Sequence, residues 1–171
     1  MNRRSFVLAM VGAPLSGAAA TGVAEGPRVR IGFLGGSHSH GWDKIQITRQ
    51  SGRYDLVGVW EEDPKVRARY EAAGVRALAR DQLLNDPSIE VIAVESDVQD
   101  HAEHARLALE AGKHVHLEKP PADTMEKFRE LVKTAERKQR LLQMGYMWRY
   151  NPAINAALPH FQQKRHTKMG I

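Results

Sequence analysis

A glycine-containing turn, Gly35–Gly41, follows an apolar stretch and is the first place where the sequence could hold a phosphate. Glycine lets backbone amides approach a pyrophosphate, and a helix that begins behind the turn adds a favourable dipole. Gly35 fills the first position of the dinucleotide pattern Gly-x-Gly-x-x-Gly, whereas Ser37 and His40 occupy the second and third. With one glycine of three in place, the turn is compatible with cofactor binding and equally with an ordinary strand-to-helix connection.

An acidic group at the end of the next apolar stretch is suited to bind a ribose. Glu61 lies 21 residues after His40, about where a carboxylate accepts hydrogen bonds from an adenosine ribose. Its neighbours Glu62 and Asp63 would repel a 2′-phosphate, and no arginine stands beside them in the sequence. This pattern favours NAD over NADP. The same acids would also suit an exposed turn at the beginning of a helix.

A third polar group, Glu118-Lys119-Pro120, ends another short apolar stretch. A lysine at a strand end can act as a point cation on a reacting hydroxyl, but Glu-Lys-Pro alone is also a common surface turn. Histidines recur two or three residues apart, a spacing that lets two side chains share a face. We expect no metal site, because no Asp or Glu is placed convincingly beside a pair. The pairs are His38/His40, His101/His104 and His114/His116.

Alternating strand and helix patterns separate these polar groups. Strands are expected over 29–34, 54–60, 75–78, 89–94, 114–117 and 141–147. Helical patterns follow Pro64, cover 81–86 and 101–111, and resume after an N-cap pattern at Asp123–Glu126. This alternation predicts an α/β fold with a doubly wound parallel sheet. Ligands of such sheets bind outside the carboxyl ends of the strands, so the three polar groups should meet at one edge.

Three segments together resemble the Gfo/Idh/MocA family of oxidoreductases, named after glucose–fructose oxidoreductase and inositol dehydrogenase. They are Ala-Gly-Lys-His-Val followed by Glu118-Lys119-Pro120, the helical run 101–112, and the run 145–152. The resemblance extends from Val29 to Ala156, in the family's order and spacing. It implies a Rossmann NAD(P)-binding domain followed by an antiparallel sheet domain, which completes the substrate site and builds a dimer or tetramer.

The resemblance also implies an activity, the transfer of hydride between a sugar or cyclitol hydroxyl and nicotinamide. Lys119 would be the catalytic residue, since it would hydrogen-bond the hydroxyl and assist its deprotonation. Glu118 and Pro120 would hold the turn, and the Lys119–Pro120 bond is often cis in the family. The residues expected to bind the cofactor, from the strand-end patterns and the resemblance together, are Gly35, Gly36, Ser37, His38, His40, Glu61, Ser96, His101, Glu118, Lys119 and Pro120.

Two departures from the family pattern concern the cofactor. The family's fuller Gly-x-Gly loop is replaced by Gly35-Gly36-Ser37, and its Ala-Thr-Pro by Glu95-Ser96-Asp97. The second change is expected to place negative charge near a dinucleotide phosphate or ribose, which weakens the inference of tight NAD binding.

The composition is that of a soluble globular domain: 171 residues, 42% apolar and 26% charged. The absence of cysteine excludes disulfides, cysteine-ligated metals and thiol nucleophiles. The net charge of +5 comes from basic residues at the two ends, because residues 25–158 contain 20 Lys and Arg against 20 Asp and Glu. We therefore expect no binding of nucleic acid.

Residues 1–24 read as an export signal. Arg3 and Arg4 precede an apolar stretch that ends in small residues, an arrangement that resembles a twin-arginine signal and predicts export to the periplasm or beyond. An uncleaved anchor or an unstructured leader is the alternative, although Pro14 and the short apolar stretch argue against a stable membrane span. Residues 25–158 would form the NAD(P)-binding domain. Residues 159–171 show no period and are expected to be disordered.

The family resemblance ends near Leu158, where a substrate domain is expected to begin. A premature stop or a shifted reading frame would explain this. Three functions stay open at this point: the cofactor half of an exported sugar oxidoreductase, an NAD-dependent exported glycosidase of the same family, and a non-catalytic binding module or inactive fragment. The partner would be a sugar-like small molecule, with a homo-oligomer only where a second domain is present.

Overall fold

The computed structural model describes residues 26–166, and the side chains of residues 26–160. Its centre is a sheet of five strands in the order β2-β1-β3-β4-β5, and every neighbouring pair is parallel. The strands are β1 (Val29–Leu34), β2 (Tyr54–Trp60), β3 (Val91–Val94), β4 (His114–Leu117) and β5 (Leu142–Met144). The predicted α/β doubly wound fold is therefore confirmed.

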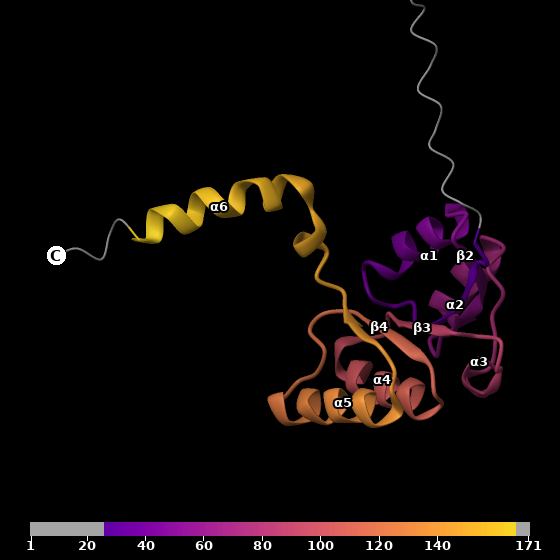
Figure 1. Cartoon of the computed structure of the whole chain (residues 1–171). Coiled ribbons are helices and arrows are strands. Elements are labelled where there is room, and N and C mark those ends of the chain that lie inside the picture. Colours follow the sequence, from indigo (N-terminus) through magenta and orange to yellow (C-terminus); the bar gives the residue numbers. More distant parts are fainter. Residues whose placement is uncertain (1–25, 167–171) are drawn as a thin grey trace, which may run out of the picture.

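Helices cover both faces of the sheet (Figure 1). The helices α1 (Gly41–Gln50) and α2 (Pro64–Ala72) enclose one core, which contains Phe33 and Ile45. The helices α3 (Arg80–Asn85), α4 (His101–Glu110) and α5 (Met125–Lys138) enclose the other, which contains Leu34, Ile92 and Leu109. Burial on both faces explains why β1 and β3 are nearly continuous in apolar residues.

The strand expected over 75–78 does not form. Val59 and Ala77 make one isolated parallel bridge, and Leu78 donates its amide to the carbonyl of Val59. A stretch this short, entered from the turn at Gly74 (φ 73°), pairs at one point beside the edge strand β2. The sheet therefore has five strands where the sequence predicted six.

Two helix ends also differ from expectation. Thr124 is the N-cap of α5, because its side chain accepts the amide of Lys127 at 3.2 Å, while Asp123 forms an ion pair with the Lys127 ammonium. After the short 3₁₀ turn η2 (Met147–Tyr150), the helix α6 (Pro152–His166) includes Pro159 and continues through part of the segment expected to be disordered. A proline inside a helix removes one hydrogen bond, and the preceding alanines favour the helix.

The helix α6 projects away from the sheet and from the other helices (Figure 1). In the part of the chain that the structure describes, no helix combines the length and the apolar character needed to cross a membrane. The predicted export signal, residues 1–24, lies outside the described residues.

Candidate functional site

The strand order reverses between β1 and β3, and the turns that leave these strands contact each other there. Gly35, at the end of β1, has a φ of 80°, and a Cβ at this position would collide with the backbone of Ser96. Its amide donates to the carbonyl of Trp60 at 2.8 Å. Three strand ends therefore meet at Gly35, at the switch point where doubly wound sheets bind their ligands.

The peptide of Gly36 is held by two buried side chains. Its amide donates to Oε2 of Glu61 at 2.7 Å, and its carbonyl accepts the hydroxyl of Tyr70 at 2.7 Å. Burial raises the pKa of Tyr70 to about 12, so the hydroxyl keeps its proton and remains a donor. A Cβ on Gly36 would collide with the Tyr70 ring. The loop is thus built around glycine at both positions, although the sequence carries only part of the usual pattern.

The acidic residues after β2 make different contacts. Glu61 is 5% exposed, and its Oε1 accepts the amide of Asp63 at 3.0 Å. Asp63 is the N-cap of α2, where its carboxylate accepts the amide of Lys65 at 2.7 Å. The guanidinium of Arg67 donates to the Glu61 carbonyl at 3.0 Å. An arginine therefore does lie beside these acids, one helical turn into α2, although none is their direct neighbour in the sequence.

A polar cavity of about 370 Å³ opens between the ends of β1, β2 and β3. It brings together four of the residues predicted to bind the cofactor, Gly35, Ser37, Glu61 and Ser96. Five carboxylates and no lysine or arginine stand among its lining residues. The full lining is Gly35, Ser37, Trp60, Glu61, Glu62, Asp63, Pro64, Ser96, Asp97, Gln99, Asp100 and His104.

This edge fits a dinucleotide. Among the residues that the structure describes, the amides of Ser37 and Ser39 donate no hydrogen bond to another protein group. His40 then caps α1 with backbone alone, so the helix N-terminus adds its dipole at the same turn. Two amides and a helix N-terminus can receive a pyrophosphate, and the Glu61 oxygens retain lone pairs for a ribose.

Lys44, which no sequence pattern distinguished, joins the ends of β3 and β4. Its ammonium, in α1, donates to Oε1 of Glu95 at 2.5 Å, to Oε2 of Glu118, and to Nε2 of His116 at 3.0 Å. Both carboxylates are completely buried, whereas the Lys44 side chain is 22% exposed. The three partners lie 51 to 74 positions after Lys44 in sequence, so no local motif could have shown the cluster.

The two carboxylates respond differently to their surroundings. Burial raises the pKa of Glu95 to about 7, against the opposing effect of Lys44, and its Oε2 has no hydrogen-bond partner in the described structure. Burial acts in the same direction on Glu118, but the bonds from Lys44 and from the Lys119 amide hold its pKa at about 2. Glu118 is therefore ionised at neutral pH. The expectation that Glu95 places charge against the cofactor is wrong, because its carboxylate is buried on Lys44; Asp97 does line the cavity.

Lys119, the predicted catalytic residue, lies on the exposed side of this cluster. Its amide donates to Oε1 of Glu118 at 2.9 Å, and its side chain is 46% exposed with Nζ 3.9 Å from the same oxygen. The Lys119–Pro120 peptide bond is cis, as the resemblance implied. A buried carboxylate thus fixes the backbone of a turn that presents an ammonium to solvent.

Two further histidines connect the strand ends. His101 is completely buried and lies 2.7 Å from the carbonyl of Pro120 and 3.0 Å from that of Ser96, one contact at each ring nitrogen. A carbonyl only accepts, so a ring N–H of His101 is the donor in such a hydrogen bond. His104 binds the Ser96 hydroxyl at 2.8 Å. The predicted cofactor residue His101 thus braces the turns after β3 and β4.

The structure also brings His38 and His40 against Glu118. One ligand atom from each of the three lies within 4.8 Å of the other two, and Nδ1 of His40 is 3.3 Å from Oε2 of Glu118. Burial lowers the pKa of His38, which favours the neutral ring. The prediction of no metal site rested on acids near a histidine pair in sequence, whereas Glu118 directly follows β4, two strands away from the strand that precedes the loop.

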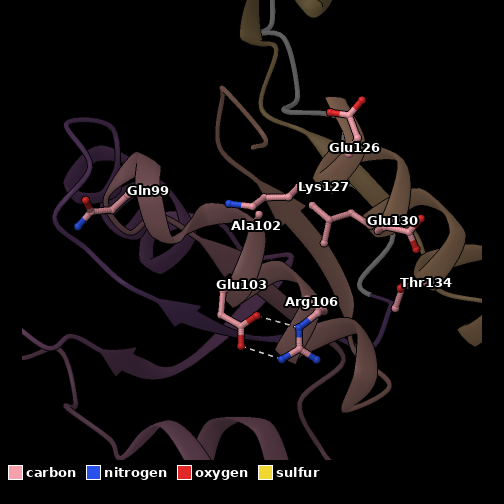
Figure 2. A pocket seen from close by; sticks show the side chains of 9 residues that line it. Gln99, Ala102, Glu103, Arg106, Glu126, Lys127, Glu130 and Thr134 are labelled. Atoms are coloured by element: carbon pink, nitrogen blue, oxygen red, sulfur yellow. Dashed lines mark hydrogen bonds and ion pairs between the residues drawn. The ribbon is translucent and has the colours of Figure 1, made fainter. Parts of the chain in front are cut away.

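A second cavity, of about 390 Å³, lies between α4 and α5 (Figure 2). Most of its lining residues differ from those at the strand edge. Its rim carries the exposed ion pair of Glu103 and Arg106, and none of the predicted site residues lines it. Exposed pairs of this kind contribute little to stability. The strand edge, with its buried charges and glycine turns, is the candidate site.

The fold and this edge define a dinucleotide-binding Rossmann domain. The chain belongs to the Gfo/Idh/MocA family: residues 29–146 match the family model described as "Oxidoreductase family, NAD-binding Rossmann fold". The family predicted from the sequence is therefore confirmed. NAD(P) binding follows from the same match, and the choice between NAD and NADP is a separate question.

Individual relatives agree with the family. The chain is 30% identical over 129 residues to inositol 2-dehydrogenase/D-chiro-inositol 3-dehydrogenase of Lactiplantibacillus plantarum, covering 72% of this chain and 35% of that protein. It is 35% identical over 125 residues to dTDP-3,4-didehydro-2,6-dideoxy-alpha-D-glucose 3-reductase of Saccharopolyspora spinosa, covering 70% and 37%. The structure of biliverdin reductase from Synechocystis sp. PCC 6803, with biliverdin and NADP+, superposes with a TM-score of 0.62 at 32% identity, covering 68% and 37%. The chain thus spans about a third of the length of these relatives.

Proposed function

We propose that this chain is the cofactor-binding part of an NAD-dependent oxidoreductase that exchanges hydride with a sugar or cyclitol hydroxyl. The observation that carries the proposal is the shared strand edge. The glycine turn and Glu61 lie at one end of this edge. Lys119, whose amide donates to the buried carboxylate of Glu118, lies at the other end. Two relatives are named for inositol and a deoxysugar nucleotide, which supports the substrate class.

The residues at this edge have distinct roles in the proposal. A bound nicotinamide supplies the hydride acceptor. Lys119 would hydrogen-bond the substrate hydroxyl and, as a cation, stabilise the oxygen while the hydroxyl proton passes to solvent water and the hydride to the nicotinamide. Glu118, ionised on Lys44, keeps the turn in position through the Lys119 amide. Glu61 binds the ribose while it holds Gly36.

The preference for NAD rests on charge. Four carboxylates besides that of Glu61 line the cavity and would repel a 2′-phosphate. Arg67 brings a positive charge close to Glu61, but its guanidinium donates to the backbone carbonyl of Glu61. One structural neighbour carries NADP+, so the preference needs a direct measurement in this chain.

Isothermal titration calorimetry of the full chain with each dinucleotide tests the proposal. We expect saturable NAD binding, weaker NADP binding, and at least about a tenfold loss of NAD affinity in Glu61→Ala, since a ribose contact to a carboxylate is worth about 1.5–3 kcal/mol. Arg67→Ala should leave the order of the two cofactors unchanged. Tighter binding of NADP, or equal affinity of the Glu61 variant, would contradict the assignment.

Exposed aromatic side chains lie between β5 and α6 and offer a surface for contact with another region of the protein. Tyr146, Trp148 and Tyr150 are 48%, 64% and 63% exposed, and they adjoin the end of β5. Large apolar side chains clustered on a surface mark interaction sites. We propose that this surface contacts the region that binds the substrate in the complete oxidoreductase.

We further propose export through residues 1–24, on the pattern Arg3-Arg4-x-Phe and the small residues that end the stretch. Fusing these residues to a folded reporter should direct it out of the cytoplasm. Replacing both arginines by lysine should abolish this transport. A reporter that stays in the cytoplasm with the native sequence would end the proposal.

A further inference from the structure

We propose that His38, His40 and Glu118 bind a divalent first-row transition metal such as Zn²⁺. The three side chains do not line the cavity between β1, β2 and β3, although His38 and His40 lie in the same glycine turn and Glu118 supports the turn that carries Lys119. Two imidazoles and one carboxylate form a donor set found in zinc and non-haem iron sites, whereas Mg²⁺ and Ca²⁺ prefer oxygen alone.

The spacing of the three groups suits a metal. Their ligand atoms all lie within 4.8 Å of one another. Nδ1 of His40 and Oε2 of Glu118 are 3.3 Å apart. Two ligands at about 2.0–2.1 Å from a tetrahedral ion are separated by about 3.3 Å. One edge of the required tetrahedron is therefore already present, and a small side-chain adjustment would complete the face.

An unsatisfied atom gives an independent indication. Nδ1 of His40 is inaccessible to solvent and makes no hydrogen bond of ordinary geometry in the described structure; its polar neighbour is Oε2 of Glu118, at 3.3 Å. Buried polar atoms are nearly always paired, and an exception calls for a partner such as an ion. A metal ion between His40 and Glu118 would satisfy this nitrogen.

Neighbouring groups support the geometry. Glu118 is completely buried and is fixed by Lys44 and by the Lys119 amide, so its carboxylate is held in place before a metal arrives. A carboxylate has about four lone-pair positions, so it can serve Lys44 and a metal at once. Hydrogen bonds from groups that surround a metal site commonly orient its ligands. The His38 amide, bonded to the Glu95 carbonyl at 3.0 Å, fixes the loop that carries both histidines.

The test uses the full chain after treatment with a chelator. Zn²⁺ is titrated by calorimetry, and Co²⁺ by its visible absorption, which reports the ligand geometry. We expect saturable binding of one ion per chain, and His38→Ala and His40→Ala should each weaken it by at least about tenfold. His160→Ala, an exposed histidine on α6, is the matched control and should bind as the native chain does.

Circular dichroism of each variant shows whether it is folded. Both loop histidines are only partly buried, so their variants should keep the fold; Glu118→Gln provides a third variant that preserves side-chain shape. The proposal is overturned if the folded native chain binds no ion in a saturable manner. It is equally overturned if the two loop-histidine variants bind as tightly as His160→Ala.

Discussion

The two ends of the strand edge hold buried carboxylates by different means. At the ends of β1 and β2, Glu61 is held by backbone amides and faces an open polar cavity. At the ends of β3 and β4, Glu95 and Glu118 share one ammonium, that of Lys44. The first end is suited to receive a ligand. The second is a closed ion-pair cluster beneath the turn that carries Lys119.

The comparison predicts different consequences of mutation. Removing the cation from a closed cluster leaves charge buried without a partner, which is costly. Altering the amide-held end changes a loop whose groups keep other partners, so the cost should be smaller.

Lys44→Ala should have the largest effect. It leaves two buried carboxylates without their shared cation, and we expect the free energy of unfolding to fall by about 3 kcal/mol. Urea denaturation at neutral pH measures this. Lys133→Ala, which removes an exposed pair with Glu130, should change stability by less than about 0.5 kcal/mol. Equal losses of unfolding free energy in the two variants would show that Lys44 stabilises the buried carboxylates no more than an exposed lysine stabilises its partner.

Glu95 should make stability depend on pH. Its pKa is raised from 4.5 to about 7 in the folded chain, so the folded state binds the extra proton over this range. The contribution is present below about pH 4.5 and is lost as the pH rises through 7. We expect unfolding free energies measured from pH 4.5 to 8 to fall more steeply in the native chain than in Glu95→Gln. Parallel curves would contradict the raised pKa.

Gly36→Ala should disturb the amide-held end by steric overlap. The added Cβ collides with the Tyr70 ring, which is completely buried and cannot easily move. A cost of about 2 kcal/mol is typical of overpacking. Gly52→Ala, where nothing lies within 4 Å of the new atom, is the control and should cost less than about 1 kcal/mol. A thermal or urea denaturation series in which both variants behave alike would rule out the packing argument.

Tyr70→Phe should have the smallest effect. It removes the hydroxyl that donates to the Gly36 carbonyl at 2.7 Å and keeps the ring, so we expect a loss of about 1 kcal/mol in unfolding free energy. The loop amide remains bound to Glu61. A loss as large as that of Lys44→Ala would mean that both ends of the edge depend on buried polar pairs to the same degree.

Features with a local sequence signal could be predicted, whereas features that arise from tertiary contacts could not. β1, β2 and β4 were predicted at their observed bounds, because apolar runs ended by polar or glycine residues are local signals. Glu61 was found from its distance to the loop. The strand at 75–78 was overpredicted, since a short apolar run does not reveal whether a neighbour is available for pairing.

Lys44 could not be predicted, because its importance arises from tertiary contacts. Nothing in α1 distinguishes it from a surface lysine until β3 and β4 bring two acids beneath it. The grouping of His38 and His40 with Glu118 has the same origin. A pair of histidines is visible in sequence, but the acid that completes the set lies 78 residues after His40.

Amide chemical-shift mapping by NMR with NAD tests most directly that the open end of the strand edge is the cofactor site. The account predicts that, on addition of NAD, the largest shifts appear at Ser37, Ser39, Glu62 and Asp97, with little change between α4 and α5. Shifts centred on the cavity of Figure 2, or none in the glycine turn of the folded chain, would contradict it.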